Sequence, residues 1–255
     1  MKWGQNFVVD KNLIKRIVDN ISPCENDNFL EIGPGDGSLT RQIYPHVNEM
    51  VVVEIDPLLI KKLQIAKNLK GLHIIHKDIL LQDICDLPIS NPLRVVGNIP
   101  YNITSPIIFW LIEQLDFWND AFIMMQKEVA ERILLNFNTK NYGRLTILAN
   151  WRLNIKKICD IKSSCFKPKP KVESTLLLFE PKIPFVELTN PKSLERITRN
   201  FFMHRRKMIK KPFLKLFNQN KNLAVKMGIN LDLRPQNLDL KTYLQLAKEY
   251  EKLRS

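Results

Sequence analysis

The sequence lacks paired cysteines and any metal-ligand spacing. Its four cysteines form no C-x-x-C pair, and only four histidines are available to join them. Structural zinc sites need closely spaced ligands of these types, so we expect no metal site. Isolated cysteines are typical of reduced thiols, which indicates a cytoplasmic protein.

Long apolar runs are absent as well. No stretch approaches the run of about 18 apolar residues that marks a transmembrane helix. The first ten residues, MKWGQNFVVD, contain no apolar core of a secretory signal. We therefore expect neither a membrane-spanning nor a secreted protein.

Acidic residues are missing from one long segment. From Arg196 to Leu231 there are ten basic residues and no acidic one, and residues 191–255 carry +11 of the total net charge of +13. Such a segment repels itself, which indicates a polyanionic partner, with nucleic acid as the first candidate. An acidic membrane surface fits less well, because Pro212 interrupts the pattern that an interfacial helix needs.

Short apolar stretches are present, and many of them alternate with helical patterns. The candidate strands are Asn28–Ile32, Met50–Ile55, Leu72–His76, Leu93–Gly97, Ala121–Gln126, Leu153–Ile161 and Val172–Phe179. The candidate helices are Leu39–Tyr44, Pro57–Lys67, Ser105–Leu115, Lys127–Asn136 and Arg144–Trp151. This alternation predicts an α/β fold with a parallel sheet. Because no helix separates the last two strands, we expect an antiparallel strand at the sheet edge.

The strand pattern ends before a proline-rich linker. Pro181, Pro184 and Pro191 mark this linker, and only helical patterns follow. These are Leu194–His204, Arg205–Phe217, Leu223–Met227 and Asp239–Leu253. We therefore expect two domains, an α/β domain over residues 1–188 and a basic helical domain over residues 189–255.

Three glycines, Gly33, Gly35 and Gly37, directly follow the first strand and precede a helix. Glycine lets the backbone approach a ligand closely, and a helix N-terminus offers free amides. The spacing is G-x-G-x-G, whereas dinucleotide sites use G-x-G-x-x-G and would need glycine at Ser38. A tight turn alone would also need glycine, so the loop by itself is weak evidence for a ligand.

Carboxylates follow the next two strands. Glu54 stands at the tip of the second strand, where it can accept both ribose hydroxyls of a nucleoside. Asp78 stands at the tip of the third strand, where it can accept from an adenine amino group. The three tips together predict a nucleoside across the C-terminal edge of the sheet.

The fourth strand ends in Asn98-Ile99-Pro100-Tyr101. Pro100 disfavours helix at Ile99 and keeps the strand exit extended. The side-chain oxygen of Asn98 and a backbone carbonyl near Ile99–Pro100 can then accept both hydrogens of an adenine amine, directing its lone pair toward a methyl donor. Tyr101 can stack on an extruded base, which is worth ~1–3 kcal/mol.

These motifs carry a resemblance to a known family. "EIGPGDG" with "VEID" resembles the nucleoside-binding loops of S-adenosylmethionine-dependent methyltransferases, and "GNIPYNITSPI" resembles the motif of those that methylate adenine at N6. With "GQNFVVD", "MMQKEVAERI", "YGRLTILAN" and "CFKPKPKVEST", nearly the whole chain resembles the small-subunit ribosomal RNA adenine dimethyltransferases, the KsgA family. The resemblance implies a Rossmann-like class I methyltransferase fold with a mainly parallel seven-stranded sheet, plus a small C-terminal all-α domain.

The resemblance also implies the activity. It implies an enzyme that uses S-adenosyl-L-methionine to dimethylate N6 of two adjacent adenosines in a hairpin near the 3′ end of small-subunit rRNA. The expected partner is that rRNA within an immature 30S-type ribosomal subunit, with no membrane involved. We expect the enzyme to act in the cytoplasm and as a monomer.

Site residues follow from the same motifs. The predicted catalytic residues are Asn98, Pro100, Tyr101 and Phe166, with Phe166 closing the other face of the adenine. The predicted cofactor-binding residues are Asn6, Val8, Gly33, Gly35, Glu54, Asp78 and Asn98. The predicted RNA-binding residues are Arg205, Arg206, Lys207, Lys210 and Lys211.

Three other functions stay open. A related enzyme type methylates large-subunit rRNA, but the Phe166 motif and the long basic C-terminal domain favour the small subunit. A non-catalytic assembly or transcription factor is disfavoured by the intact Asn98-Ile99-Pro100-Tyr101, and a nicotinamide oxidoreductase by the missing third glycine. One departure from the family is that only Met1, Lys2 and Trp3 precede "GQNF", where members usually carry a longer basic extension.

Overall fold

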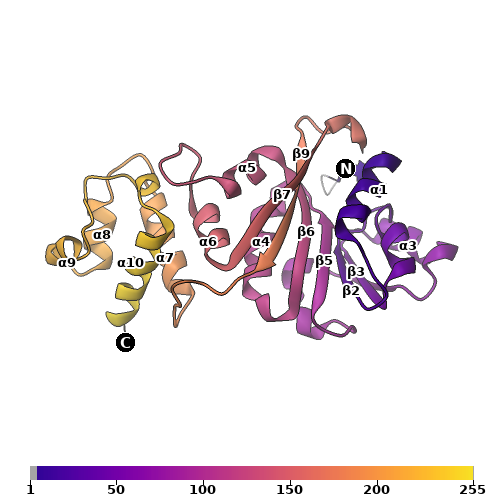
Figure 1. Cartoon of the computed structure of the whole chain (residues 1–255), viewed down its shortest axis with the longest axis horizontal. Helices are drawn as coiled ribbons and strands as arrows, with labels where there is room; N and C mark the ends of the chain where they lie inside the picture. Colours follow the sequence, from indigo (N-terminus) through magenta and orange to yellow (C-terminus); the bar gives the residue numbers. More distant parts are fainter. Residues whose placement is uncertain (1–4, 255) are drawn as a thin grey trace. The chain divides into compact units, whose positions relative to one another are not determined.

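A sheet of seven strands forms the centre of the first part of the chain in this computed structural model, which describes residues 5–254. The three residues before "GQNF", its Gly4, and Ser255 lie outside the described residues. The sheet order is β4-β3-β2-β5-β6-β9-β7, and Figure 1 shows the strands side by side. The strands are β2 (Asn28–Ile32), β3 (Glu49–Glu54), β4 (His73–His76), β5 (Leu93–Asn98), β6 (Trp118–Gln126), β7 (Leu153–Ile161) and β9 (Ser174–Pro181).

The first five strands pair in parallel, as the alternation of strands and helices predicts. The helices along this part are α1 (Lys11–Ile21), α2 (Thr40–Ile43), α3 (Pro57–Gln64), α4 (Thr104–Glu113) and the start of α5 (Lys127–Leu134). A separate two-stranded ladder joins β1 (Phe7–Val8) to β8 (Phe166–Lys167). The fold therefore confirms the predicted Rossmann-like architecture with seven strands in the main sheet.

The expected position of the antiparallel strand is wrong. Strand β9 is antiparallel to both neighbours and lies between β6 and β7, so β7 is the edge strand. The residue types explain this order. Strand β9 reads STLLLFEP and is buried over most of its length, whereas β7 carries exposed lysines at Lys156 and Lys157. An apolar strand needs cover on both sides, and charged side chains suit an edge.

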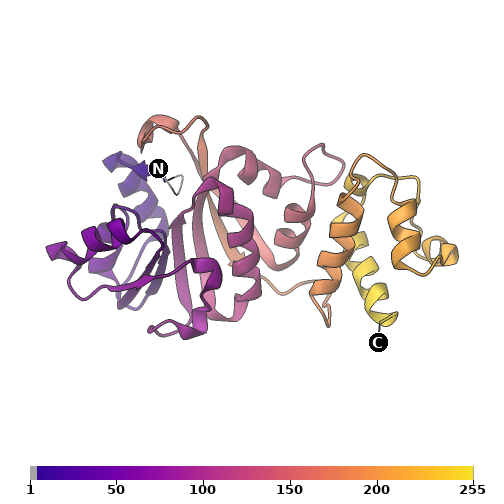
Figure 2. The same cartoon turned by 180° about the vertical axis from the view of Figure 1, so that it is seen from behind.

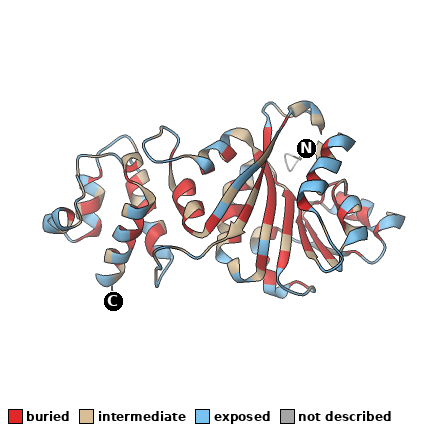
Figure 3. Ribbon diagram, in the orientation of Figure 1, coloured by how far each residue is buried: buried red, intermediate tan, exposed pale blue. Residues whose placement is uncertain are grey.

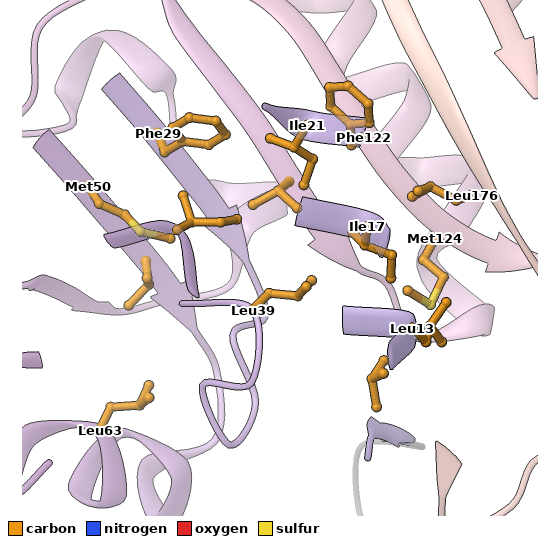
Figure 4. Packing of buried hydrophobic residues seen from close by; sticks show 14 of the residues in the cluster. Leu13, Ile17, Ile21, Phe29, Leu39, Met50, Leu63, Phe122, Met124 and Leu176 are labelled. Carbon is orange, nitrogen blue, oxygen red and sulfur yellow. The ribbon is translucent and has the colours of Figure 1, made fainter. Parts of the chain in front are cut away.

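Helix α1 was not predicted, although its signals are present. Asp10 caps the helix by accepting from the amides of Asn12 and Leu13. Its apolar residues Leu13, Ile17 and Ile21 are buried against the sheet. Figure 4 shows them facing side chains of β2, β3 and β6. Figure 2, seen from behind, shows α4 over the opposite face.

A second compact unit holds the rest of the chain. Residues 5–130 and 153–181 form unit 1, and residues 131–152 and 182–254 form unit 2. Unit 2 contains the rest of α5 and then α6 (Arg144–Arg152), α7 (Lys192–Phe202), α8 (Lys210–Leu216), α9 (Lys221–Lys226) and α10 (Leu240–Lys252). Figure 3 shows the buried faces of the helices in red.

The expected boundary at residue 188 assigns α6 to the first domain, but its contacts place it with the last helices. Helix α6 packs on α7 and α10 through its apolar residues, of which Leu145, Ile147, Leu148 and Trp151 are buried. The functional division at residue 188 stays a prediction.

The helix predicted over Arg205–Phe217 begins later. Helix α8 starts at Lys210, and residues 203–208 form turns. The reason is Pro212, which has no backbone N–H and would clash with the carbonyl four residues earlier in a helix interior. A start at Lys210 places Pro212 in the first turn, where an N–H would have no intrahelical partner.

Membrane-spanning helices and metal-binding groups of side chains are both absent among residues 5–254. No helix among them is long and apolar enough to cross a membrane. No three His, Cys, Asp or Glu side chains in the same stretch are grouped so as to hold a metal ion.

Arg94 joins three elements of unit 1. Its guanidinium forms ion pairs with Asp27 at 2.8 Å and Asp120 at 2.9 Å. It also donates to the carbonyls of Ile21 at 2.6 Å and Ser22 at 3.3 Å, which end α1. With 16% of its side chain exposed, Arg94 neutralises two carboxylates that would otherwise be left uncompensated beside the sheet.

We predict that Arg94→Leu lowers the free energy of unfolding by about 3 kcal/mol, because it leaves two carboxylates unpaired. The melting temperature should fall by roughly 6–12 °C in thermal unfolding followed by circular dichroism. Lys156→Leu, which breaks an exposed pair with Glu180, is the control and should change stability by less than about 1 kcal/mol. Equal losses in the two variants would contradict the role of Arg94.

Candidate active site

The carboxyl ends of β2, β3, β4 and β5 meet at one edge of the sheet and border a cavity of about 650 Å³. Parallel pairing brings these ends together, because strands that run the same way finish at the same edge. Predicted site residues line this cavity: Asn6, Val8, Gly33, Gly35, Glu54, Asp78, Asn98, Pro100 and Tyr101.

The glycine loop forms one wall of the cavity. Gly33 and Gly35 have φ angles of +64° and +61°, which favour glycine. A Cβ at Gly35 would lie 2.9 Å from the ring of Phe7, so the loop and the N-terminal strand approach too closely for any side chain there. Phe7 lines the cavity too and was not predicted, although it stands between Asn6 and Val8, which were.

The carboxylate of Glu54 is held by backbone amides. It accepts from Gly35 N at 3.2 Å and from Ile55 N and Asp56 N at 2.9 Å. Burial raises the pKa of Glu54 above its ordinary value, while these amides act in the opposite direction. The three bonds fix the direction of the carboxylate. Two of them occupy Oε1, so Oε2 keeps one lone pair for a ligand hydroxyl.

One of the two carboxylate oxygens of Asp78 accepts a backbone hydrogen bond. Its Oδ1 caps the short helical turn Ile79–Leu81 by accepting from Leu80 N at 3.0 Å. The cap fixes the side chain at the tip of β4 and leaves Oδ2 as an acceptor toward the cavity.

Glu31 lines the cavity from β2 and was quoted in the glycine motif without a role. It is 2% exposed and accepts from Thr40 Oγ1 at 2.6 Å. Burial raises the pKa of Glu31 to about 7, and the charges of Glu54 and Asp36 add to the effect. Four acidic residues line the cavity with a single lysine, and this excess of negative charge favours a ligand with positive charge.

The amide of Asn98 is oriented by the N-terminal segment. Its Nδ2 donates to the backbone carbonyl of Asn6 at 2.7 Å. No residue between 5 and 254 donates a hydrogen bond to its Oδ1, which therefore remains an acceptor at the cavity. This hydrogen bond thus joins the motifs "GQNF" and "NIPY", although Asn6 and Asn98 are 92 positions apart in the sequence.

The strand exit after Asn98 exposes one backbone acceptor. Ile99 N donates to Met124 O at 3.2 Å, and Pro100 O accepts from Ile103 N at 3.1 Å. The carbonyl of Ile99 accepts from no described residue. Pro100 has φ −54° and ψ 134°, which continues the extended path that the sequence predicts.

Tyr101 is tethered through its hydroxyl. The hydroxyl lies 2.9 Å from Ser174 Oγ on β9, and Ser174 is fully buried. The bond fixes one end of the ring while the ring itself lines the cavity. Ser174 was quoted in the motif "CFKPKPKVEST", but no role was predicted for it.

Phe166 does not line this cavity. It is 4% exposed, pairs with Val8 through β8, and belongs to the core cluster beneath β1. Its predicted stacking on adenine stays a prediction. Its observed position holds the N-terminal strand, and through it Asn6, at the cavity wall.

The predicted RNA-binding residues lie in unit 2. Arg206, Lys207, Lys210 and Lys211 are exposed. Arg205 is partly buried, and its Nη2 donates to the carbonyls of Lys140 and Tyr142, the second at 3.0 Å. Arg205 therefore holds a loop of unit 2, whereas the other four present their charges to solvent.

Comparisons with known proteins identify the family of this chain. The sequence model of the family described as "Ribosomal RNA adenine dimethylase" matches residues 1–252. The chain belongs to this family. "Ribosomal RNA small subunit methyltransferase A" of Pelagibacter ubique is 48% identical to this dimethylase over 98% of the chain and 96% of the relative. The protein of the same description from Tolumonas auensis is 36% identical over 96% and 92%.

Two solved structures are similar over nearly the full length. A dimethyladenosine transferase from Plasmodium falciparum is 28% identical, with a TM-score of 0.76, and the match covers 96% of this dimethylase and 98% of that chain. The 23S rRNA methyltransferase ErmE is 25% identical, with a TM-score of 0.66 and coverages of 98% and 100%. The family and the methyltransferase fold predicted from the motifs are thus confirmed.

The methyl donor of this family is S-adenosylmethionine, as predicted. The cavity suits it, because the close approach at Gly35 leaves backbone atoms at the wall and four acidic residues line a space for a positively charged nucleoside. When bound, the donor supplies a methyl group on a sulfonium that needs no activation. Gly33, Gly35, Glu54 and Asp78 are the residues that would hold it.

The raised pKa of Glu31 makes stability depend on pH. The folded protein keeps a proton on Glu31 up to about pH 7, whereas the unfolded chain releases it near 4.5. The free energy of unfolding therefore falls as the pH rises between these values. We predict that Glu31→Gln, which avoids the ionisation, is more stable than the unaltered chain by up to about 3 kcal/mol at pH 8 and by little near pH 4.

Thermal unfolding of both proteins between pH 4 and pH 8 measures this difference. The exposed Glu25→Gln is the matched control and should follow the unaltered chain. A gap between Glu31→Gln and the unaltered chain that stays constant across the pH range would contradict the assignment.

Proposed function

We propose that this dimethylase transfers two methyl groups to N6 of each of two adjacent adenosines in a hairpin near the 3′ end of small-subunit rRNA. The substrate in this proposal is an immature 30S-type subunit, and the enzyme acts as a monomer in the cytoplasm. The relatives named as small-subunit enzymes, which are 36–48% identical over nearly the full chain, support the choice of substrate.

One observation carries the chemistry: the Asn98 amide points its oxygen at the cavity because its nitrogen is held by Asn6 O. The exocyclic amine of adenine is a poor nucleophile, because its lone pair is delocalised into the ring. Two acceptors, Asn98 Oδ1 and Ile99 O, can take its two hydrogens and leave the lone pair directed away from them. These bonds strengthen as positive charge develops on the nitrogen, so they stabilise the transition state more than the ground state.

Tyr101 contributes orientation in this proposal. An extruded base needs a surface to replace its lost stacking partners. The ring of Tyr101, held through Ser174, offers such a surface beside the two acceptors. The proton that the methylated amine loses can pass to water, so no general base among the side chains is required.

A second candidate is methylation of large-subunit rRNA, which the likeness to ErmE favours. Incubation with S-adenosylmethionine and either immature small subunits or naked large-subunit rRNA separates the two substrates, with primer extension locating the modified bases. Stops at two adjacent adenosines in small-subunit rRNA support the proposal. Modification of the large-subunit RNA alone would overturn it.

We predict that Asn98→Asp lowers kcat by about 10²-fold or more. The carboxylate cannot donate to Asn6 O and would be repelled by it, so the side chain loses its direction. Turnover is measured at saturating donor and RNA, so that a change in affinity does not enter. Asn102→Asp adds the same charge at another cavity residue and is the control. Equal losses in both variants would mean that added charge, and not lost orientation, lowers the rate.

We predict that Tyr101→Phe and Ser174→Ala each lower kcat by a few fold, because each breaks the same hydrogen bond, which is worth about 1 kcal/mol. The double variant should be no slower than either single variant, since the bond is already lost. A methylation assay on all four proteins forms the cycle. Losses that multiply in the double variant would show that the two hydroxyls act independently.

A further inference from the structure

Arg144 is the first residue of α6, and the backbone around it is fixed within unit 2. Arg205 donates to the carbonyls of the loop just before it. Thr146, in the first turn, donates from Oγ1 to Arg132 O at 2.7 Å. The position of Arg144 is therefore set by its surroundings and not by its own side chain.

The guanidinium of Arg144 has no partner among residues 5–254. Its Nε is buried without a hydrogen bond, and the side chain forms no ion pair with any of those residues. Arg94 pairs with two carboxylates and Arg205 with two carbonyls, whereas the Nε of Arg152, at the other end of α6, is buried without a hydrogen bond like that of Arg144. A half-buried arginine without an acceptor is unusual, because a buried charge normally has one.

A second cation lies on the neighbouring helix. Helix α7 packs against α6, as Figure 1 shows, and carries Arg199, which is exposed and also forms no ion pair within the described part of the chain. Burial lowers the pKa of Arg144 below its ordinary value, and the charge of Arg199 adds to this while that of Glu195 opposes it. Glu195 is thus near enough to act through its charge but forms no ion pair with Arg144.

We propose that Arg144 and Arg199 form a phosphate-binding site in unit 2 that takes one phosphodiester group of the substrate RNA. A bound anion would supply the hydrogen-bond acceptor that the Arg144 guanidinium lacks within the described part of the protein. Its negative charge would also offset the repulsion between the two arginines. The planar guanidinium suits phosphate because it donates two parallel hydrogen bonds. RNA is the polyanion chosen because the site rests on the proposed function, and because no acidic residue lies between Arg196 and Leu231 to compete for Arg199.

The test is the salt dependence of binding to transcribed small-subunit rRNA, measured by filter binding between about 50 and about 300 mM KCl. Each phosphate contact contributes roughly 0.7–0.9 to the slope of log affinity against log salt. We expect Arg144→Gln to weaken binding roughly tenfold at low salt and to reduce the slope by about one contact. Arg144→Lys should keep the slope and lose part of the affinity, because the charge stays and the paired hydrogen bonds are lost.

Matched variants sharpen the test. Lys248→Gln removes one exposed charge from α10 of the same unit and should change affinity less than about twofold. In the double variant Arg144→Gln with Arg199→Gln, the slope of log affinity against log salt should fall by the amount expected for one phosphate contact and no more. The reason is that both arginines hold the same phosphate. The melting temperature of Arg144→Gln should be equal to or above that of the unaltered chain, because the free protein loses no partner.

Two results would overturn the proposal. One is an Arg144→Gln slope equal to that of Lys248→Gln. The other is a melting temperature that drops by several degrees together with affinity, which would assign Arg144 a purely structural role. The proposed function fails separately: an unaltered chain that binds RNA but transfers no methyl to small subunits refutes the function, whereas an active chain with unchanged slopes refutes only this site.

Discussion

The hydrogen bond from Asn98 Nδ2 to the Asn6 carbonyl is the interaction on which the arrangement of the site depends. An asparagine amide can present either end to a ligand, and the two ends have opposite hydrogen-bonding character. Because Asn98 Nδ2 is bonded to the Asn6 carbonyl, Asn98 Oδ1 faces the cavity. The same bond closes the cavity, because Asn6 belongs to the segment that forms its wall.

That bond relies on the strand pairing and helix packing that hold the N-terminal segment. Strand β1 is only two residues long, and its partner β8 holds it through Val8 and Phe166. Val9 N donates to Cys165 O at 2.9 Å, and Asp10 caps α1 directly afterwards. The apolar face of α1 is buried on the sheet, so the segment is anchored by the strand pairing and by the helix that follows it. The orientation of the amide proposed to act on adenine is thus supplied by packing around a distant segment.

Charge is distributed differently in the two units. In unit 1 the acidic residues Glu31, Asp36, Glu54 and Asp78 gather at the cavity, where burial raises the pKa of Glu31 and of Glu54. In unit 2 the basic residues lie on helices and turns, and most of them face solvent. An acidic pocket suits a positively charged donor, and a basic surface suits a phosphate backbone, so the two fields fit the two reactants of the proposed reaction.

Local patterns by themselves determined the strands of the sheet, the glycine loop, the acidic tips and the motif around Asn98. These features depend on neighbours in the chain, such as apolar runs, Pro100 and the glycine spacing, and all but one of the site residues predicted in unit 1 line the cavity. Only the tertiary structure decided that β9 is inserted before β7, that α6 joins the last helices, that Asn6 turns the Asn98 amide, and that Phe166 is buried. Each of these depends on a contact between segments far apart in the chain. Periodicity and propensity carry no information about such contacts, because the residue that supplies the partner is set by the fold as a whole.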